Sequence, residues 1–78
     1  MHVRNYNVFL PTVEKVKEFV KTISKFAGKA VLTSGIYVID AKSIMGVLSL
    51  DLTKTVELTL DAPLSKDMET SLQPFFAK

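Results

Sequence analysis

The sequence predicts one α+β domain over residues 1–78, an open-faced sandwich in which helices cover one face of a four-stranded antiparallel sheet. Three observations support this fold. Apolar residues recur at steps of three and four between residues 13 and 26, as in an amphipathic helix. Several short runs are rich in residues that favour strands. Two later segments each begin with a serine that can cap a helix. In chain order, the elements read βαββαβα.

The chain begins with a strand and its longest helix. Residues 2–9 carry aromatic and β-branched side chains, and the following Leu10-Pro11 pair stops the strand. The apolar face of the helix is formed by Val13, Val16, Phe19, Val20, Ile23 and Phe26. Thr12 is the expected N-cap, because its hydroxyl can accept a hydrogen bond from a free amide of the first turn. Gly28 is expected to end the helix in a left-handed conformation.

The middle of the chain predicts a hairpin followed by a short helix. Residues 30–34 and 36–40 are rich in strand formers, and Gly35 between them allows a tight turn. Ser43 is then expected to cap a helix over residues 44–50.

A further strand and a last helix complete the predicted order. Residues 56–60, VELTL, alternate apolar and polar side chains, as in a strand with one buried face. Ser65 can cap the last helix, whose first turn carries Asp67 and Glu69, where the helix dipole favours negative charge. Pro74 is expected to end this helix, because proline lacks an N–H and crowds the carbonyl four residues earlier. The last residues then form a packed tail.

The composition excludes several classes of protein. Apolar residues make up 47% of the chain and charged residues 23%, which is typical of a soluble globular domain. The net charge of +2 and the scattered aromatic residues do not indicate a nucleic-acid-binding surface. No apolar run approaches the ~20 residues needed to cross a bilayer, and no secretory signal is present, so we expect a cytoplasmic protein. With one histidine, no cysteine and no catalytic motif, the sequence predicts neither a metal site, nor a cofactor, nor an enzyme.

Two segments resemble one known family. Thr22–Phe26, TISKF, is similar to the end of the first helix of the HPr family, the small phosphocarrier proteins of the bacterial sugar phosphotransferase system. Ala41–Leu50, AKSIMGVLSL, resembles the regulatory-serine segment of that family almost residue for residue. The resemblance extends without gaps to Ala62 and implies the HPr fold and protein partners from the same system. The turn after the serine segment differs, with Asp51 and Thr53 in place of glycines.

The phosphocarrier signature of the family is altered in this chain. Counted back from the two segments, the family's Gly-x-His-x-Arg-Pro motif falls on residues 10–15, which read LPTVEK. Thr12 therefore stands in place of the phosphorylated histidine, and Glu14 in place of the arginine. A phosphothreonine is an ordinary ester with little drive to transfer, and a carboxylate ~5 Å from phosphate costs about 3 kcal/mol per unit charge at an effective dielectric of ~20. His2 lies at the chain end, so we expect no histidine phosphocarrier activity.

Ser43 has two interpretations that the residues leave open. A serine at an N-cap contributes about 1 kcal/mol by satisfying an amide at the helix end. The resemblance implies instead that an HPr-type serine kinase phosphorylates Ser43 and thereby regulates the protein. Lys42, next in the chain, could offset part of the added charge.

The short helix after Ser43 carries more apolar side chains than it can bury. Ile44, Met45 and Leu48 cannot all face inward if Val47 and Leu50 do. The resemblance implies that the first three form the patch that partner proteins contact. A small domain also exposes some apolar atoms without any function.

A basic row runs along the first helix through Lys17, Lys21 and Lys25. A solvated face is the usual meaning of such a row. In the HPr fold it would flank the end of the molecule that carries Thr12 and Ser43, where it could contact an acidic partner.

The sequence therefore supports three hypotheses. The first is an HPr-like regulatory protein without histidine relay, which docks through the helix at Ser43 onto an HPr-type serine kinase, phosphotransferase-system proteins or transcriptional regulators. The second is a phosphocarrier that still accepts a phosphoryl group, on Thr12 or by an altered chemistry. The third is an interaction module without phosphorylation, in which the exposed helix mediates self-association.

Overall fold

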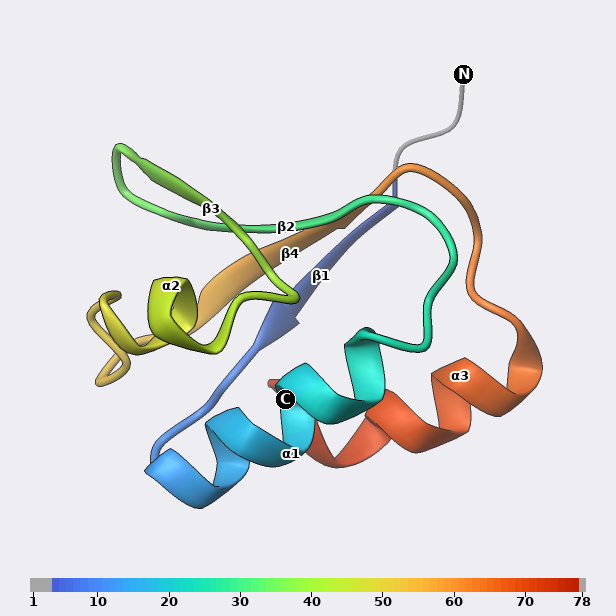
Figure 1. The fold of residues 1–78 in the computed structure, drawn as a ribbon, viewed down its shortest axis with the longest axis horizontal. Helices are drawn as coiled ribbons and strands as arrows, with labels where there is room; N and C mark the ends of the chain where they lie inside the picture. Colours follow the sequence, from blue (N-terminus) through green and yellow to red (C-terminus); the bar gives the residue numbers. More distant parts are fainter. Residues whose placement is uncertain (1–3, 78) are drawn as a thin grey trace.

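The computed structural model describes residues 4–77 and confirms the predicted α+β order (Figure 1). The strands are β1 (Arg4–Val8), β2 (Ala30–Ser34), β3 (Tyr37–Asp40) and β4 (Val56–Leu60). The helices are α1 (Val13–Ile23), α2 (Ile44–Leu48) and α3 (Lys66–Leu72), and a 3-10 turn, Gln73–Phe75, follows α3. The start of the predicted first strand, including His2, lies outside the described residues.

The strands form an antiparallel sheet in the order β1-β4-β2-β3. The helices lie on one side of this sheet, with α1 packed beside α3 (Figure 1). The alternation predicted for β4 is confirmed, because Val56, Leu58 and Leu60 are buried beneath the helices. Glu57 and Thr59 lie on the opposite, open face. The other face of the sheet therefore holds the core.

Packing of α1 against the sheet fixes where its N-terminus lies. Val16, Phe19 and Ile23 of α1 are fully buried. Phe19 meets Phe75 edge to face, with the ring centroids 5.6 Å apart. Leu72 at the end of α3 is also fully buried. The long helix and the C-terminal segment thus share one core.

The β2–β3 hairpin turns through Gly35 and Ile36. Gly35 has a φ of +60°, which glycine adopts without steric cost. No other residue type among residues 4–77 has a positive φ, so Ile36 follows in an ordinary conformation and the turn is of type II′. Ser34 pairs with Tyr37 across the turn, and β3 begins at Tyr37, one residue later than predicted.

The prediction that Gly28 ends α1 in a left-handed conformation is wrong. Gly35 is the glycine with a positive φ in the described part of the chain. The helix already ends at Ile23, and Phe26 lies beyond it as a buried core residue. Glycine at position 28 instead leaves space, because an added Cβ would clash with Oδ1 of Asp61. The constraint comes from a long-range contact and not from the local backbone.

The two shorter helices begin where predicted. Ser65 caps α3, with its Oγ accepting a hydrogen bond from the N–H of Met68 at 3.2 Å. This helix ends at Leu72, before Pro74, as predicted. The end of α2 at Leu48 comes two residues earlier than predicted, and the remaining segment forms a turn toward β4.

Candidate functional site

Thr12 lies at the N-terminus of α1, where its predicted capping role is confirmed. Its Oγ1 accepts a hydrogen bond from the N–H of Lys15 at 3.1 Å, and its backbone is extended. Thr12 and Glu14 are both exposed. The position therefore offers a reachable hydroxyl with a carboxylate nearby in the first turn of the helix.

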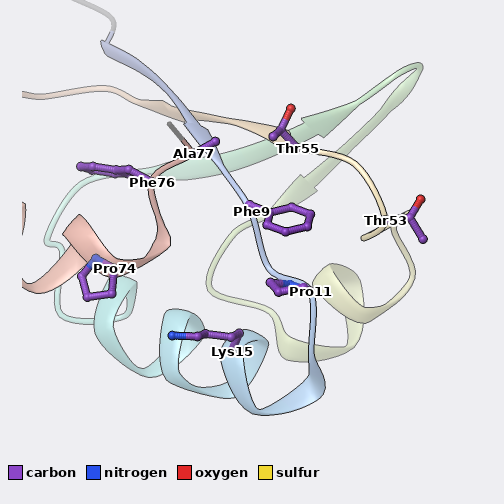
Figure 2. Close-up of a pocket in the computed structure, with 8 residues that line it drawn as sticks. All are labelled: Phe9, Pro11, Lys15, Thr53, Thr55, Pro74, Phe76 and Ala77. Atoms are coloured by element: carbon purple, nitrogen blue, oxygen red, sulfur yellow. The ribbon is translucent and has the colours of Figure 1, made fainter.

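A hollow of about 500 Å³ lies beside this helix N-terminus (Figure 2). It is lined by Phe9, Pro11, Lys15, Thr53, Thr55, Pro74, Phe76 and Ala77. Figure 2 shows Phe9 near the middle of this group. Lys15 supplies the one charged side chain of the lining, and its Nζ lies 5.7 Å from the centroid of the Phe75 ring, in the range of a cation–π contact.

Sequence reasoning missed this hollow because its lining comes from distant segments. The C-terminal segment reaches β1 through two backbone hydrogen bonds of 2.8 Å, from Phe9 N–H to the carbonyl of Phe75 and from Ala77 N–H to the carbonyl of Asn7. Local sequence patterns do not predict a contact between segments near the two ends of a chain.

Ser43 caps α2, as predicted. Its Oγ accepts a hydrogen bond from the N–H of Gly46 at 3.2 Å, and its own N–H donates to the carbonyl of Asp40 at 3.0 Å. Glycine at position 46 leaves room for this hydroxyl, since an added Cβ would lie 3.3 Å from the Ser43 Oγ. The residue is half-buried. Its hydroxyl therefore has a structural role.

Lys42 does not extend toward the hydroxyl of Ser43. Its Nζ donates to the carbonyl of Phe26 at 2.6 Å and to the carbonyl of Gly28 at 2.9 Å. The ammonium also lies 6.0 Å from the centroid of the Phe26 ring. The idea that Lys42 offsets charge at Ser43 is therefore wrong for this arrangement, because the side chain is bound to the segment that follows α1.

The apolar residues of α2 divide between the core and the surface. Val47 is fully buried and Leu50 is 7% exposed. Met45 is 75% exposed and Leu48 is 39% exposed, so the sequence argument from helix geometry is confirmed for these two. Ile44 is half-buried and packs against the core, which limits its part in any contact surface.

The expected basic row is shorter than the sequence suggested. Lys17 and Lys21 are exposed on α1, which packs against α2. Lys25 is exposed as well, but it lies beyond the end of α1 at Ile23 and does not continue the helical row.

The turn after α2 is held by Asp51. Its Oδ1 accepts hydrogen bonds from the Thr53 hydroxyl at 2.6 Å and from the Thr53 N–H at 3.1 Å. These two bonds, together with the nearby charge of Lys54, hold the pKa of Asp51 below its usual range. Where glycines would turn the chain by conformational freedom, this chain uses a side chain that bonds its own backbone.

Two further properties of the described residues concern metal binding and membrane spanning. Residues 4–77 contain no group of three or more His, Cys, Asp or Glu side chains placed to hold a metal ion. Across the same residues, no helix has the length and apolar character required to span a bilayer. The fold and these surfaces define a small α+β protein with a hydroxyl at the start of each of two neighbouring helices.

Comparison with known proteins identifies the family of this protein. A sequence model of the family, described as "PTS HPr component phosphorylation site", matches residues 13–73. A crystal structure of HPr-C-His from Thermoanaerobacter tengcongensis is similar with a TM-score of 0.72, at 24% identity over 95% of this chain and 89% of that chain. A phosphocarrier protein HPr from Bacillus anthracis str. Ames is similar with a TM-score of 0.68, at 22% identity over 94% of this chain and 89% of that chain. No curated protein matches this chain.

The chain belongs to the HPr family of the phosphotransferase system, as its sequence resemblance implied. The two solved structures share its fold. HPr proteins interact with other proteins of the phosphotransferase system, so protein partners are the class that this membership supports. The match begins at Val13 and leaves out Thr12, the position at issue for the phosphocarrier reaction.

The lowered pKa of Asp51 predicts a pH-dependent contribution to stability. A carboxyl whose pKa is lower in the folded state stabilises the fold above its unfolded pKa of about 4, and this contribution is lost as the pH falls through the folded pKa. Asp51→Ala should therefore be less stable than the parent at pH 7, and the difference should shrink at pH 3. Urea unfolding of both proteins at the two pH values measures it.

Thr53→Val is the control for this prediction, because it removes the hydroxyl that is the largest cause of the lowered pKa. It should reduce the pH dependence while leaving the carboxylate in place. If the difference in unfolding free energy between Asp51→Ala and the parent is the same at pH 7 and pH 3, the lowered pKa of Asp51 is contradicted.

Proposed function

We propose that this HPr-family protein is a cytoplasmic, bacterial regulatory docking protein that does not relay phosphoryl groups through histidine. It acts through α2, and phosphorylation of Ser43 changes which partner binds. The observation that carries the proposal is the position of Ser43 directly before an exposed apolar pair, Met45 and Leu48. The protein binds other proteins and does not itself catalyse a reaction.

The residues at the start of α1 are unsuited to phosphoryl relay. A phosphoryl group on an imidazole nitrogen can be handed onward, whereas the hydroxyl of Thr12 would hold it as a stable ester. Glu14, two residues later in the first turn, places a negative charge where a phosphoryl acceptor is helped by a positive one. The hydroxyl of Thr12 is also engaged in capping the helix.

The hydrogen bond between Ser43 and Gly46 allows for phosphorylation of Ser43. Its Oγ would take the γ-phosphoryl group of ATP, with release of ADP and of the hydroxyl proton. The new group carries roughly −1.5 to −2 charge and strong acceptor oxygens. One of these oxygens can replace the Oγ as the acceptor for the N–H of Gly46, which the hydroxyl now bonds at 3.2 Å. The modification is therefore compatible with the folded helix.

The added charge would stand beside the apolar surface that a partner contacts. Met45 is 75% exposed, and an exposed methionine adapts to different partner surfaces. Lys17 and Lys21 are exposed on α1, which packs against α2, and we include their positive charge in the proposed contact surface. A partner with an acidic rim fits the unmodified protein, and phosphorylation would weaken that match. Candidate partners are an HPr-type serine kinase, phosphotransferase-system proteins and transcriptional regulators.

Incubation with an HPr-type serine kinase and ATP should add one phosphoryl group to Ser43. Intact mass and site mapping measure the outcome. Ser43→Ala should abolish the modification. Ser65→Ala is the matched control and should still be modified at Ser43. Ser65 makes the same capping contact, to the amide three residues later, but it caps α3 instead of α2. An unmodified parent protein, or phosphate mapped to another serine, would remove the regulatory switch and favour an interaction module without phosphorylation.

Incubation with phosphoenolpyruvate and the first enzyme of the phosphotransferase system should leave the parent protein unlabelled. The variant with Thr12→His and Glu14→Arg restores the missing acceptor and cation and should gain label, which shows that the enzyme can dock on this fold. Radiolabel transfer measures both. Stable label on the parent, mapped to Thr12, would instead support a phosphocarrier with altered acceptor chemistry.

A further inference from the structure

The strand β3 forms an edge of the sheet, and its outer side is uncovered in the described part of the chain. The opposite edge, β1, is different, because the C-terminal segment pairs with it at Val8 and Phe76. Figure 1 shows the β2–β3 hairpin extending away from the other elements, with α2 beneath it. Exposed edge strands are templates for pairing with another strand.

The outer surface of this edge is unusually apolar. Ile36 is 90% exposed, and Tyr37 and Val38 are each 64% exposed. Natural edge strands are commonly protected by lysine, proline or bulges. The run from Gly35 to Ile39 carries no charge and no proline. Three consecutive exposed apolar residues on a soluble domain indicate a contact surface.

The backbone of Val38 is oriented for pairing with an outside strand. Tyr37 closes the two-residue turn opposite Ser34, and at the far end of the hairpin Ala41 N–H donates to the carbonyl of Ala30 at 2.9 Å. Residues along an antiparallel strand alternate between bonding to one neighbour and to the other. Val38 therefore directs its N–H and its carbonyl away from β2.

We propose that this protein forms a symmetric dimer in which β3 pairs antiparallel with β3 of a second copy, centred on Val38. The two-fold axis of this dimer is perpendicular to the sheet, so the helix-covered faces of both copies lie on the same side of the joined sheet. Residues that pair must then point to the same face, and a pairing of Val38 with itself meets this condition. It also joins two outward-facing backbone groups in a pair of N–H to carbonyl bonds, so this register satisfies both the hydrogen-bond pattern and the face pattern.

The same register gives the most exposed apolar side chain a place to bind. With Val38 opposite itself, Ile36 of each copy lies opposite Asp40 of the other. A hollow of about 390 Å³ lies at this end of β3 and is lined in part by Val31, Val38 and Asp40. Val31 pairs with Asp40, and both lie on the face of the sheet that Val38 shares. Because a two-fold interface is self-complementary, the contact occurs twice, which favours a second copy over an unrelated strand.

The oligomeric state as a function of concentration tests the proposal. Sedimentation velocity on the parent protein, from the micromolar to the millimolar range, should show a reversible monomer–dimer equilibrium. Val38→Lys should abolish the dimer, because it places two like charges opposite each other at the axis. Ile36→Asp should do the same, because it places a carboxylate opposite Asp40 of the other copy. Met45→Asp is the control for self-association through α2 and should leave the dimer intact. A parent that stays monomeric throughout, or a dimer lost with Met45→Asp and kept with Val38→Lys, overturns the proposal.

A cysteine pair tests the register independently of affinity. The chain has no cysteine, so a single introduced thiol can form a disulfide only between two copies. In the proposed register the two Val38 Cα atoms lie about 5.5 Å apart, inside the ~4.4–6.8 Å range of disulfides. Val38→Cys should therefore cross-link under mild oxidation.

Tyr37→Cys is the matched control, because its exposure equals that of Val38. Tyr37 lies opposite Ile39 of the second copy, so its own counterpart is shifted by two residues, or roughly 6.6 Å along the strand, and is out of reach of a strain-free disulfide. It should remain largely monomeric under the same oxidation. Equal cross-linking of the two variants would show random collision and would overturn the register.

Discussion

The arrangement of the functional surface depends on holding in place a helix that is too short to form by itself. α2 contains five residues, whereas isolated helices shorter than roughly 12 residues are marginal in water. Its stability must come from its surroundings. Val47 is buried in the core, the Oγ of Ser43 accepts from the N–H of Gly46, and the Oγ of Ser49 donates to the carbonyl of Gly46 at 2.6 Å. A modification at Ser43 therefore acts on one of the few contacts that define this helix.

The same constraint places an exposed apolar surface next to Ser43, where we propose recognition and regulation. A five-residue helix packed by one face must leave other side chains outside, and here these are Met45 and Leu48. The start of α1 is different, because that helix is anchored by three buried side chains and its cap at Thr12 is not needed to present an apolar surface. The fold at this end therefore places little demand on the identity of residue 12 beyond the cap. The proposed docking depends on the shape of α2, whereas phosphoryl relay depends on a particular side chain.

Local sequence patterns predicted most of the fold, and long-range contacts account for what they missed. The caps at Thr12, Ser43 and Ser65 follow from a hydroxyl placed before an apolar run, and all three are present. The role of Gly28 depends on Asp61, far away in the chain, and no local pattern reports that contact. Lys42 likewise binds carbonyls that precede it by 14 and 16 residues. Its position next to Ser43 in the sequence therefore suggested a charge-offsetting role that this arrangement of its side chain does not support.

The candidate sites were predicted less completely than the fold. Helix periodicity was sufficient to infer that some apolar residues of α2 face outward, but not that Ile44 would be half-buried. The hollow beside Thr12 was invisible because it forms where the C-terminal segment meets β1. The free side of β3 depends on strand order, which short-range patterns do not determine.

The most direct test of the account is an amide map of the protein synthesised with phosphoserine at position 43, compared with the unmodified protein by NMR and hydrogen exchange. We expect shift changes confined to residues 43–48, with the amide of Gly46 still protected because a phosphate oxygen accepts its hydrogen bond. Loss of protection throughout α2 would contradict the account, since phosphorylation would then unfold the docking helix instead of changing the charge beside it.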